Sequence, residues 1–438
     1  MTETEGAAPA DRPVLVVDLD GTLLRSDMLY ESLWATLGRD GWAGLRAAAS
    51  VTDGRAVVKR RLAEADAIDV TTLPYDLDVR DRVAAWRAEG GRTALVTATD
   101  QRIADAIAAH LGLFDDVLGS DGSRNLKGEA KAAALIERYG EGAFIYFGDS
   151  AADLAVWRHA AKAVSVGAPA NIRTQLDASP VEAEHLDRPA PWRGLARAIR
   201  PQQWVKNILV LVPLIADPRH GLGDLPVIIA AFFALSFVAS AGYLINDLLD
   251  LADDRSHPRK RTRPIASGAL SAQIATFAVP ALLILGLMIA AFVSGALLAV
   301  VALYFVATLA YSVKLKQHTL VDICLLAFLF TLRIIAGGAA IGAALSVWIL
   351  AFSMFIFFAL AAVKRLAELT DLEAGGREAS RRGYIVGDRR VDSQKAITSG
   401  YLAVLVLALY VDEPETELKF STPWLLWGIC PLLIFWVS

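Results

Sequence analysis

The sequence predicts a protein of two parts: an α/β domain on a parallel sheet, then an all-α bundle that crosses a membrane several times. Up to about residue 188, short apolar runs alternate with amphipathic stretches, which is typical of strands covered by helices. Beyond that point, long apolar runs are separated by short polar loops. The 55% share of hydrophobic residues and the mean hydropathy of +0.43 agree with a chain that lies partly in lipid.

Four segments follow from this division. Residues 1–12 carry acidic side chains and no apolar core, so we expect a disordered tail and not a secretory signal peptide. Residues 13–188 form the α/β domain, in which residues about 27–75 have the pattern of a small helical cap. Residues 189–204 are rich in Pro and Arg and contain two Trp, as expected of a juxtamembrane linker. Residues 205–438 form the membrane domain.

Overall composition excludes some classes of function. The formal net charge of −4 is too small to indicate a nucleic-acid partner. Cys324 and Cys430 lie far apart within apolar runs, so the sequence indicates neither a disulfide framework nor a cysteine-based metal site.

The strands of the α/β domain end in polar residues. The predicted strands are Val14–Asp18, Thr93–Thr97, Ala143–Phe147 and Ala163–Val166. Asp18 and Asp20 close the first strand, Thr97 closes the second, and Asp149 follows the third. Ligands of parallel sheets bind at the carboxyl ends of strands. A carboxylate there can accept a phosphoryl group if a metal neutralises the charge and a nearby acid protonates the leaving oxygen.

The motif DLDGTL at residues 18–23 resembles the first motif of the haloacid dehalogenase superfamily, and the resemblance extends through the domain. It implies a phosphatase in which Asp18 is the nucleophile and Asp20 is the general acid and base. It also implies that Thr97 in LVTAT binds the phosphoryl group by a hydrogen bond. A domain retained only as a scaffold is the alternative, but every expected side chain is present.

The same resemblance assigns the charged residues of the two later motifs. Lys131 in KGEAK would offset the phosphoryl charge, with Lys127 as a competing candidate. Mg²⁺ would be held by the side chains of Asp18, Asp149 and Asp153 and by the backbone of Asp20. Asp149 and Asp153 belong to the motif GDSAAD. In this superfamily an insertion at residues 27–75 closes over small phosphorylated substrates. Trp34 could select a ligand there, although an aromatic residue at helical spacing is more often part of the cap core.

A charged stretch, Asn246–Gly268, follows directly on an apolar run. If it begins as a helix, Asn246, Asp250 and Asp254 recur at every fourth position and Asp247 precedes Asp250 by three. All four then lie within an arc of roughly 100° and form one polar stripe. Such oxygen ligands suit Mg²⁺ bound to a diphosphate. Cationic donors to phosphate follow downstream: Arg255, His257, Arg259, Lys260, Arg261 and Arg263. The alternative is a solvated loop whose charges only fix topology.

Eight apolar runs predict eight membrane spans, of which the first and the last are short. They lie at about 207–216, 226–245, 272–293, 295–313, 319–341, 345–363, 395–411 and 422–437. Lys and Arg concentrate in the loops after the second, fourth and sixth spans, whereas the other loops contain only Arg219 and Lys419. The positive-inside rule therefore places these loops and the α/β domain in the cytoplasm, at an inner or plasma membrane of bacterial type.

Two ionisable residues lie inside the fifth span, where a charge is costly. Asp322 and Arg333 are eleven residues apart, so on a helix they share one inward face within about 20°. The helix separates them by about 16 Å, which forbids direct contact. We expect them to line a polar cavity, with a structural ion pair to some other residue as the alternative.

The stretch NDLLDLADD resembles the first aspartate motif, NDxxDxxxD, of the UbiA superfamily of membrane prenyltransferases, matched at Asn246, Asp247, Asp250 and Asp254. The second motif of that superfamily, DxxxD, is absent, because residues 364–384 offer Glu368, Asp371 and Glu373 in another spacing. RPQQWVKN, HPRKRTRPIASG, YSVKLK, LRIIAGG and VKRLAEL resemble the decaprenyl-phosphate phosphoribosyltransferase branch. Members commonly have nine spans, one more than is predicted here.

The resemblance implies phosphoribosyl pyrophosphate as donor and a polyprenyl phosphate as acceptor. Mg²⁺ on Asn246, Asp250 and Asp254 would stabilise departing pyrophosphate, and Asp247 would orient donor hydroxyls. Cations for the two anionic substrates would be Lys206, Lys260, Arg263, Arg333 and Lys364.

The leading hypothesis is therefore a membrane phosphoribosyltransferase fused to a phosphatase that removes phosphate from the lipid product. One alternative is transfer of a prenyl group from a prenyl diphosphate lipid to an aromatic acceptor. The other is a membrane-anchored phosphatase with a non-catalytic helical module.

Overall fold

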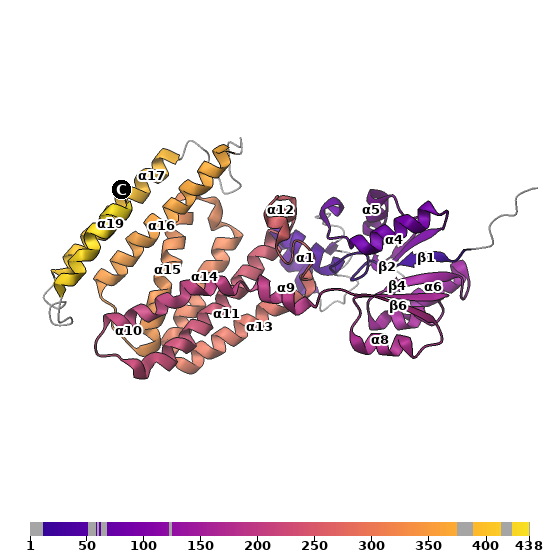
Figure 1. The fold of residues 1–438 in the computed structure, drawn as a ribbon, viewed down its shortest axis with the longest axis horizontal. Helices are drawn as coiled ribbons and strands as arrows, with labels where there is room; N and C mark the ends of the chain where they lie inside the picture. Colours follow the sequence, from indigo (N-terminus) through magenta and orange to yellow (C-terminus); the bar gives the residue numbers. More distant parts are fainter. Residues whose placement is uncertain are drawn as a thin grey trace, which may run out of the picture. The chain divides into compact units, whose positions relative to one another are not determined.

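Residues 12–50, 58, 61–62, 68–121, 125–374, 389–412 and 423–437 are described by the computed structural model, shown in Figure 1. Nearly all of the expected disordered tail, part of the expected cap and residues 375–388 lie outside these ranges. The chain divides into two compact units. Unit 1 comprises residues 1–198 and 247–277, and unit 2 comprises residues 199–246 and 278–438. The segment with the aspartate motif from residue 247 onward thus packs with the α/β domain.

Unit 1 contains a six-stranded parallel sheet in the order β3-β2-β1-β4-β5-β6. Its strands are β1 Val14–Val17, β2 Thr93–Asp100, β3 Asp116–Ser120, β4 Phe144–Gly148, β5 Lys162–Val166 and β6 Glu182–Leu186. The four predicted strands are β1, β2, β4 and β5. The edge strands β3 and β6 are partly exposed and contain polar residues, which hid them from a search for apolar runs.

Alternation along β1 places its side chains on two faces of the sheet. Leu15 and Val17 join one core cluster with helices α4 and α5, whereas Val14 and Val16 join another with α6, α7 and α8. Both faces are covered, so the central strands are apolar throughout. The helices of unit 1 are α1 Met28–Arg39, α2 Gly41–Ala49, α4 Leu77–Ala88, α5 Gln101–Leu111, α6 Glu129–Tyr139, α7 Leu154–Trp157, α8 Ala170–Asp177, α9 Pro191–Ala198 and α12 Leu251–Ser256, with 3-10 turns η2 Val70–Thr72, η3 Ala151–Asp153 and η6 Lys260–Thr262.

Aspartates cap the helices that surround the carboxyl edge of the sheet. Asp27 accepts a hydrogen bond from the backbone N–H of Leu29 at the start of α1, and Asp100 does the same at the start of α5. Asp76 caps α4 and also accepts hydrogen bonds from Arg25 and Arg188, which tie the loop after β1 and the end of the domain together.

Unit 2 consists of helices. They are η4 Pro201–Leu211, α10 Val212–Ala216, η5 Leu222–Asp224, α11 Leu225–Leu249, α13 Ala272–Val293, α14 Gly295–Val313, η7 Leu315–Gln317, α15 Thr319–Ile341, α16 Val347–Ala374, α17 Arg389–Val411, η9 Pro423–Gly428 and α19 Ile429–Val437. The ends of α11 and α13 that fall in residues 247–277 belong to unit 1.

Six helices among the described residues are long and apolar enough to span a membrane. They cover Leu222–Leu249, Ala272–Val293, Gly295–Val313, Thr319–Ile341, Val347–Asp371 and Arg389–Val411. The prediction of eight spans is therefore wrong. The first run falls on η4 and the five-residue α10, and the last falls on η9 and the nine-residue α19. Neither gives the roughly 20 helical residues that a bilayer requires.

Small residues allow close packing inside unit 2. A Cβ on Gly337 of α15 would lie 2.1 Å from the carbonyl oxygen of Val210 in η4. The backbones of η4 and α15 therefore touch at a point where only glycine fits, as is common between membrane helices. This contact places the LRIIAGG motif beside the residues that follow the motif RPQQWVKN.

Candidate active site

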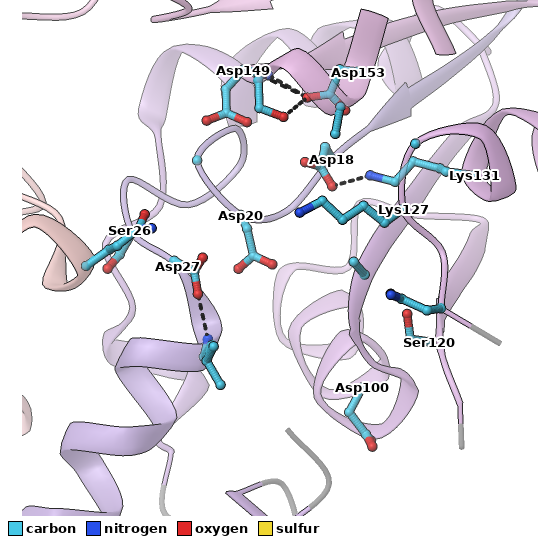
Figure 2. Close-up of a pocket in the computed structure, with 18 of the residues that line it drawn as sticks. Asp18, Asp20, Ser26, Asp27, Asp100, Ser120, Lys127, Lys131, Asp149 and Asp153 are labelled. Atoms are coloured by element: carbon cyan, nitrogen blue, oxygen red, sulfur yellow. Dashed lines mark hydrogen bonds and ion pairs between the residues drawn. The ribbon is translucent and has the colours of Figure 1, made fainter. Parts of the chain in front are cut away.

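A pocket of about 750 Å³ opens at the carboxyl edge of the sheet in unit 1 (Figure 2). At its base lie Asp18, Asp20, Lys131, Asp149 and Asp153, the charged residues that the sequence predicted to meet there. Strand register explains this convergence, because Val17 lies opposite Leu95 of β2 and Phe147 of β4. The residues that follow β1 and β4 are thereby neighbours.

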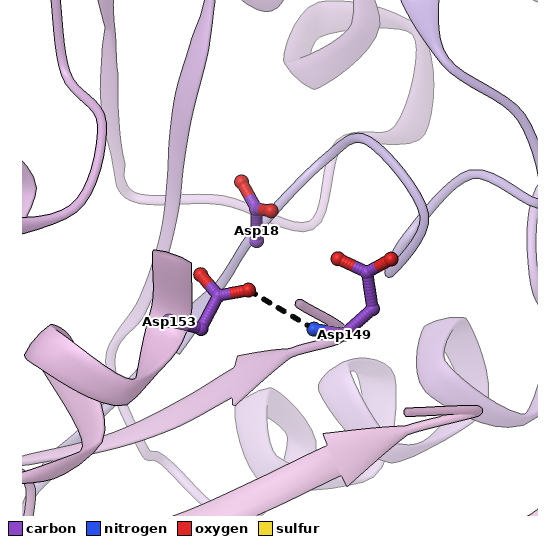
Figure 3. A group of neighbouring side chains, drawn as sticks. All are labelled: Asp18, Asp149 and Asp153. Atoms are coloured by element: carbon purple, nitrogen blue, oxygen red, sulfur yellow. Dashed lines mark hydrogen bonds between the residues drawn. The ribbon is translucent and has the colours of Figure 1, made fainter. Parts of the chain in front are cut away.

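Three carboxylates form the base of the pocket (Figure 3). Asp18, Asp149 and Asp153 each offer one oxygen, and these oxygens lie within 4.8 Å of one another. Magnesium binds oxygen at about 2.1 Å, so two ligands of one ion lie up to about 4.2 Å apart. The three side chains need only a small inward movement to share a cation.

Asp153 is held by hydrogen bonds that fix its orientation. Its Oδ2 accepts from the backbone N–H of Ser150 at 2.9 Å and from the Ser150 hydroxyl at 2.8 Å. Its Oδ1 accepts from the hydroxyl of Tyr146 at 2.7 Å. Tyr146 was not predicted, and the available signal was a tyrosine within a fully buried strand, whose hydroxyl needs a partner.

Lys131 contacts the expected nucleophile directly. Its Nζ donates to Asp18 Oδ1 at 2.7 Å and to the Tyr146 hydroxyl at 3.0 Å, and Lys131 and Asp18 are both buried. Burial opposes the charge of Lys131, but the Asp18 and Asp153 carboxylates outweigh it and raise the lysine pKa. Lys127 lines the pocket without a hydrogen bond to Asp18, so the geometry favours Lys131 for the predicted role.

Negative charge exceeds positive charge at the base of the pocket. Burial raises the pKa of Asp18 to about 7 against the effect of Lys131, and Asp153 and Asp20 add to the rise. Burial, Asp18 and Asp153 likewise raise the pKa of Asp149 well above its usual range. A divalent cation would remove this repulsion, so the donor set fits Mg²⁺.

Asp20 lies at the base of the pocket, whereas Thr97 does not line it. Asp20 is oriented by the backbone N–H of Met28, at 2.7 Å from Oδ1, and by the hydroxyl of Thr99, at 2.9 Å from Oδ2. Thr97 is fully buried and its hydroxyl accepts from the backbone N–H of Thr99 at 3.0 Å. Thr97 was predicted to bind the phosphoryl group but does not line the pocket. Thr99 was not predicted, and it contacts Asp20, the expected general acid.

Side chains of the aspartate motif also gather in unit 1, but not as one helical stripe. Helix α11 ends at Leu249, and Asp250 has φ −92° and ψ 13° before α12 begins. The helix is interrupted, so the periodicity assumed from the sequence stops at Asp250. Asp247 and Asp254 are nevertheless both buried.

Arg263 joins these two carboxylates. Its Nη1 donates to Asp247 Oδ1 at 2.9 Å and to Asp254 Oδ2 at 2.5 Å. The other oxygen of Asp254 is buried without a hydrogen bond from any described residue, and the Nζ of Lys260 is 3.9 Å from it. Burial raises the pKa of Asp254 despite Arg263. This unsatisfied oxygen is the part of the motif that best fits a metal ligand.

Asn246 belongs to unit 2, where its Oδ1 accepts from Lys316 Nζ at 3.4 Å. The sequence pointed to Asn246 as a metal ligand, and the structure adds a lysine at the same oxygen. Asp250 is half-buried at the start of α12.

Arg333 lies at the centre of a polar network in unit 2. Its guanidinium donates to Asn207 Oδ1 at 2.9 Å and to the Tyr304 hydroxyl at 2.9 Å, and it lies 4.8 Å from the ring centre of Phe330. The Nζ of Lys206 lies 5.9 Å from the centre of the same ring. Aromatic faces thus hold two cations close together.

Further cations surround Lys206. Burial lowers its pKa, and the positive charges of Lys364, Arg333 and Arg200 lower it further. Arg200 was not predicted. It stacks over Tyr243 at 5.3 Å and has a left-handed backbone, φ 54°, which is unusual for a residue other than glycine. We call Arg200, Lys206, Arg333 and Lys364 the cationic cluster.

Asp322 is held differently from Arg333. Both are buried, as their shared inward face predicts, but Asp322 forms a two-fold ion pair with Arg365 of α16. Arg365 also donates to Glu368. Asp322 is therefore part of a buried ion pair between α15 and α16, and the expectation that it lines a cavity is wrong for this residue.

Comparison with known proteins matches each part of the chain to a family. A model of the UbiA prenyltransferase family matches residues 210–438, and a model of haloacid dehalogenase-like hydrolases matches residues 15–158. A Sinorhizobium fredii protein described as uncharacterized protein y4nM is 37% identical over 420 residues, covering 94% of this chain and 81% of that protein.

Two further relatives have more specific descriptions. Nodulation protein NoeC of Azorhizobium caulinodans is 34% identical over 250 residues, covering 57% of this chain and 81% of that protein. Decaprenyl-phosphate phosphoribosyltransferase of Mycolicibacterium smegmatis is 39% identical over 188 residues. That match covers 42% of this chain and 59% of the relative, which is less than two thirds of its length.

Proposed function

Because this chain belongs to the UbiA prenyltransferase family and adds a haloacid dehalogenase-like domain, we propose that it is a membrane transferase that moves phosphoribosyl from phosphoribosyl pyrophosphate to a polyprenyl phosphate. The name of the Mycolicibacterium smegmatis relative supports this choice of substrates. We further propose that the haloacid dehalogenase-like domain removes the ribosyl phosphate from the lipid product. Both activities would operate at the cytoplasmic side of the membrane.

The cationic cluster is the observation that supports phosphoribosyl pyrophosphate as donor and a lipid phosphate as acceptor. Transfer between phosphoribosyl pyrophosphate and a lipid phosphate brings two polyanions together, so it needs more positive charge than transfer of a prenyl group to a neutral ring. Lys206 and Arg333 both lie over the ring of Phe330, and the charges of Arg200 and Lys364 also act on the half-buried Lys206. The missing DxxxD motif agrees, because it would hold a second acidic ligand set.

The proposed transfer forms one bond and breaks one. An oxygen of the lipid phosphate attacks the anomeric carbon of the donor, and the bond from that carbon to pyrophosphate breaks. The acceptor oxygen is already an anion, so no general base is required. Lys206, Arg333 and Lys364 would bind phosphate groups, as would Lys260 and Arg263.

The aspartate motif would serve the leaving group. Asn246, Asp250 and Asp254 are the proposed Mg²⁺ ligands, and the buried oxygen of Asp254 that accepts no hydrogen bond from the described residues is the atom that most needs a cation. Magnesium bound there would act as a Lewis acid toward departing pyrophosphate. Arg263 neutralises Asp247 and Asp254 in this structure, and we propose that Asp247 orients donor hydroxyls when substrate binds.

The phosphatase step would use the pocket of unit 1. Asp18 attacks phosphorus and forms an acyl phosphate while Asp20 donates a proton to the leaving oxygen, and water then releases phosphate with Asp20 as base. Asp18, Asp149, Asp153 and the backbone of Asp20 would hold Mg²⁺, which neutralises phosphoryl charge. Lys131 keeps Asp18 in place through a 2.7 Å hydrogen bond.

A donor competition assay tests the transferase. The full chain in detergent, with Mg²⁺ and a polyprenyl phosphate, is given labelled phosphoribosyl pyrophosphate in the presence of unlabelled prenyl diphosphate. We expect label in the lipid fraction and little competition from prenyl diphosphate. Prenylation of an added aromatic acceptor, with no ribose entering lipid, would favour prenyl transfer, the function that the family description suggests as an alternative.

A further inference from the structure

The segment that carries the aspartate motif is built into the phosphatase-like domain. Arg255 of α12 and Glu31 of α1 form a two-fold ion pair, with N–O distances of 3.0 and 2.9 Å, and both side chains are buried. Helix α1 is the first helix of the expected cap. This ion pair anchors the cap to Arg255, the residue that follows Asp254, although Glu31 and Arg255 are far apart in the sequence.

Further contacts extend this attachment along α1 and α13. The Trp34 indole N–H donates to the Thr276 hydroxyl at 2.7 Å, so Trp34 anchors the cap and does not line the pocket. The rings of Tyr30 and Phe277 meet edge to face at 5.8 Å. A Cβ on Gly38 would lie 2.7 Å from the carbonyl oxygen of Leu249, so α1 touches the end of α11 directly.

The same segment forms part of the pocket wall. The pocket of Figure 2 is lined by Ser271 and Gln273 together with Leu29 and Tyr30 of the cap. The backbone N–H of Ala272 donates to the Ser26 hydroxyl at 3.2 Å, which fixes Ser271 and Gln273 beside the loop after β1. The Gln273 amide has no hydrogen-bond partner among the described residues.

The wall is suited to hydroxyl groups. Gln273, Ser271 and Asn125 supply amide and hydroxyl groups, and the carboxylates of Asp27 and Asp100 accept hydrogen bonds, while Lys127 and Arg102 in the same lining carry positive charge. A volume of about 750 Å³ is much more than one phosphate group needs, and it is typical of a pocket that holds a whole small ligand.

We propose that Ser271 and Gln273, at the N-terminal end of membrane helix α13, determine specificity in the phosphatase pocket by binding the hydroxyl groups of a phosphorylated polyhydroxy substrate. This proposal rests on the phosphatase activity proposed above and names the class of its substrate: a phosphomonoester of a sugar-like, polyhydroxy group. Residues 247–277 therefore form a fixed wall of the phosphatase site. This wall would bind the organic group to which the phosphate is attached.

Two probes separate recognition from chemistry. The full chain in detergent with Mg²⁺ is assayed with ribose 5-phosphate, which has hydroxyl groups, and with p-nitrophenyl phosphate, which has none. We expect Gln273→Ala to raise KM for ribose 5-phosphate about fivefold, as for one lost hydrogen bond, and to leave both kinetic constants for p-nitrophenyl phosphate unchanged. Gln175→Ala, an exposed glutamine on α8, is the matched control and should leave both substrates unaffected.

Binding is measured separately, by calorimetry with ribose 5-phosphate on the Asp20→Asn protein with and without Gln273→Ala. Unchanged KM and unchanged affinity in the Gln273 variant would overturn the proposed wall even if the enzyme is an active phosphatase. Affinity that depends on Gln273 in a protein that hydrolyses neither probe would keep the wall and refute the phosphatase. Equal weakening for both probes would also refute it, because a general distortion of the site would then explain the effect.

Discussion

Lys131 is the residue on which the phosphatase geometry depends most directly. Its Nζ contacts both Asp18 and Tyr146 inside the pocket, whereas Lys127 lines the same pocket without contacting Asp18. We predict that Lys131→Ala lowers kcat for phosphate release by about 100-fold or more, because it removes a buried positive charge beside the transferred phosphoryl group. Lys127→Ala should cause a much smaller loss. A larger effect of Lys127 in the same assay would exchange the two roles.

Asp76 controls stability and not chemistry. Its buried carboxylate caps α4 and binds Arg188 at 2.7 Å and Arg25 at 3.0 Å. Burial would raise its pKa, but Arg188 and Arg25 outweigh burial and lower it. A lowered folded-state pKa means that the stabilisation is complete above the unfolded pKa, near 3.8, and is lost as pH falls through the folded value.

We therefore predict that Asp76→Asn lowers the Tm of the detergent-solubilised protein by about 5 °C or more at pH 7, since two partly buried arginines lose their buried carboxylate partner. The difference from wild type should begin to shrink as pH falls below about 3.8, where Asp76 of the unfolded chain gains a proton, and should vanish only below the lower pKa of the folded state. Melting curves at pH 7, 5 and 3.5 measure this. A Tm difference that does not change with pH would contradict the assignment.

At the residue scale, the sequence predicted the functional side chains at the ends of strands but not the side chains that form hydrogen bonds with them. Asp18, Asp149 and Asp153 follow from strand positions and the parallel sheet, and the structure brings them together. Tyr146 and Thr99 point into the site from within strands, where their sequence context is that of ordinary core residues. Arg200 precedes a proline in a linker, so only its contact with Tyr243 shows that it joins the cationic cluster.

At the scale of elements, the central strands and the long membrane helices were predictable because each buries a continuous apolar run. The edge strands β3 and β6 were not, since an edge strand is partly exposed and tolerates polar residues. The first and last apolar runs misled the span count because hydropathy does not reveal that a run is divided between a 3-10 turn and a short helix. The interruption of the helix at Asp250 likewise has no clear signal in the sequence.

The ion pair of Arg255 and Glu31 makes a prediction for one element, the cap helix α1. Removing one partner of a buried pair leaves an uncompensated charge and costs about 3 to 5 kcal/mol. We predict that Glu31→Gln speeds amide hydrogen exchange in residues 28–39 while β1 and β4 remain protected. Arg82→Ala breaks an exposed pair with Glu184 and should leave exchange in α1 unchanged. Equal exchange in α1 of wild type and Glu31→Gln would show that the segment does not anchor the cap.

At the scale of the whole molecule, one segment would serve both of the proposed sites. Residues 247–277 carry most of the aspartate motif and also supply a wall of the phosphatase pocket. Fusion would then do more than connect the two domains, because the phosphatase site would be incomplete in a fragment that ended at residue 198. The sequence predicted the two domains as separate blocks, since contacts between distant segments leave no trace in composition or periodicity.

We propose that the chain adds a phosphoribosyl group to a lipid phosphate and then removes the 5-phosphate of that group. The most direct measurement uses phosphoribosyl pyrophosphate labelled with ¹⁴C in the ribose and ³²P in the 5-phosphate, together with polyprenyl phosphate and Mg²⁺. We predict that wild type leaves ¹⁴C in lipid and releases ³²P as phosphate, that Asp18→Asn leaves both labels in lipid, and that Asp250→Ala incorporates neither. Labelling of lipid that is unaffected by Asp250→Ala, or release of ³²P that is unaffected by Asp18→Asn, would contradict the claim.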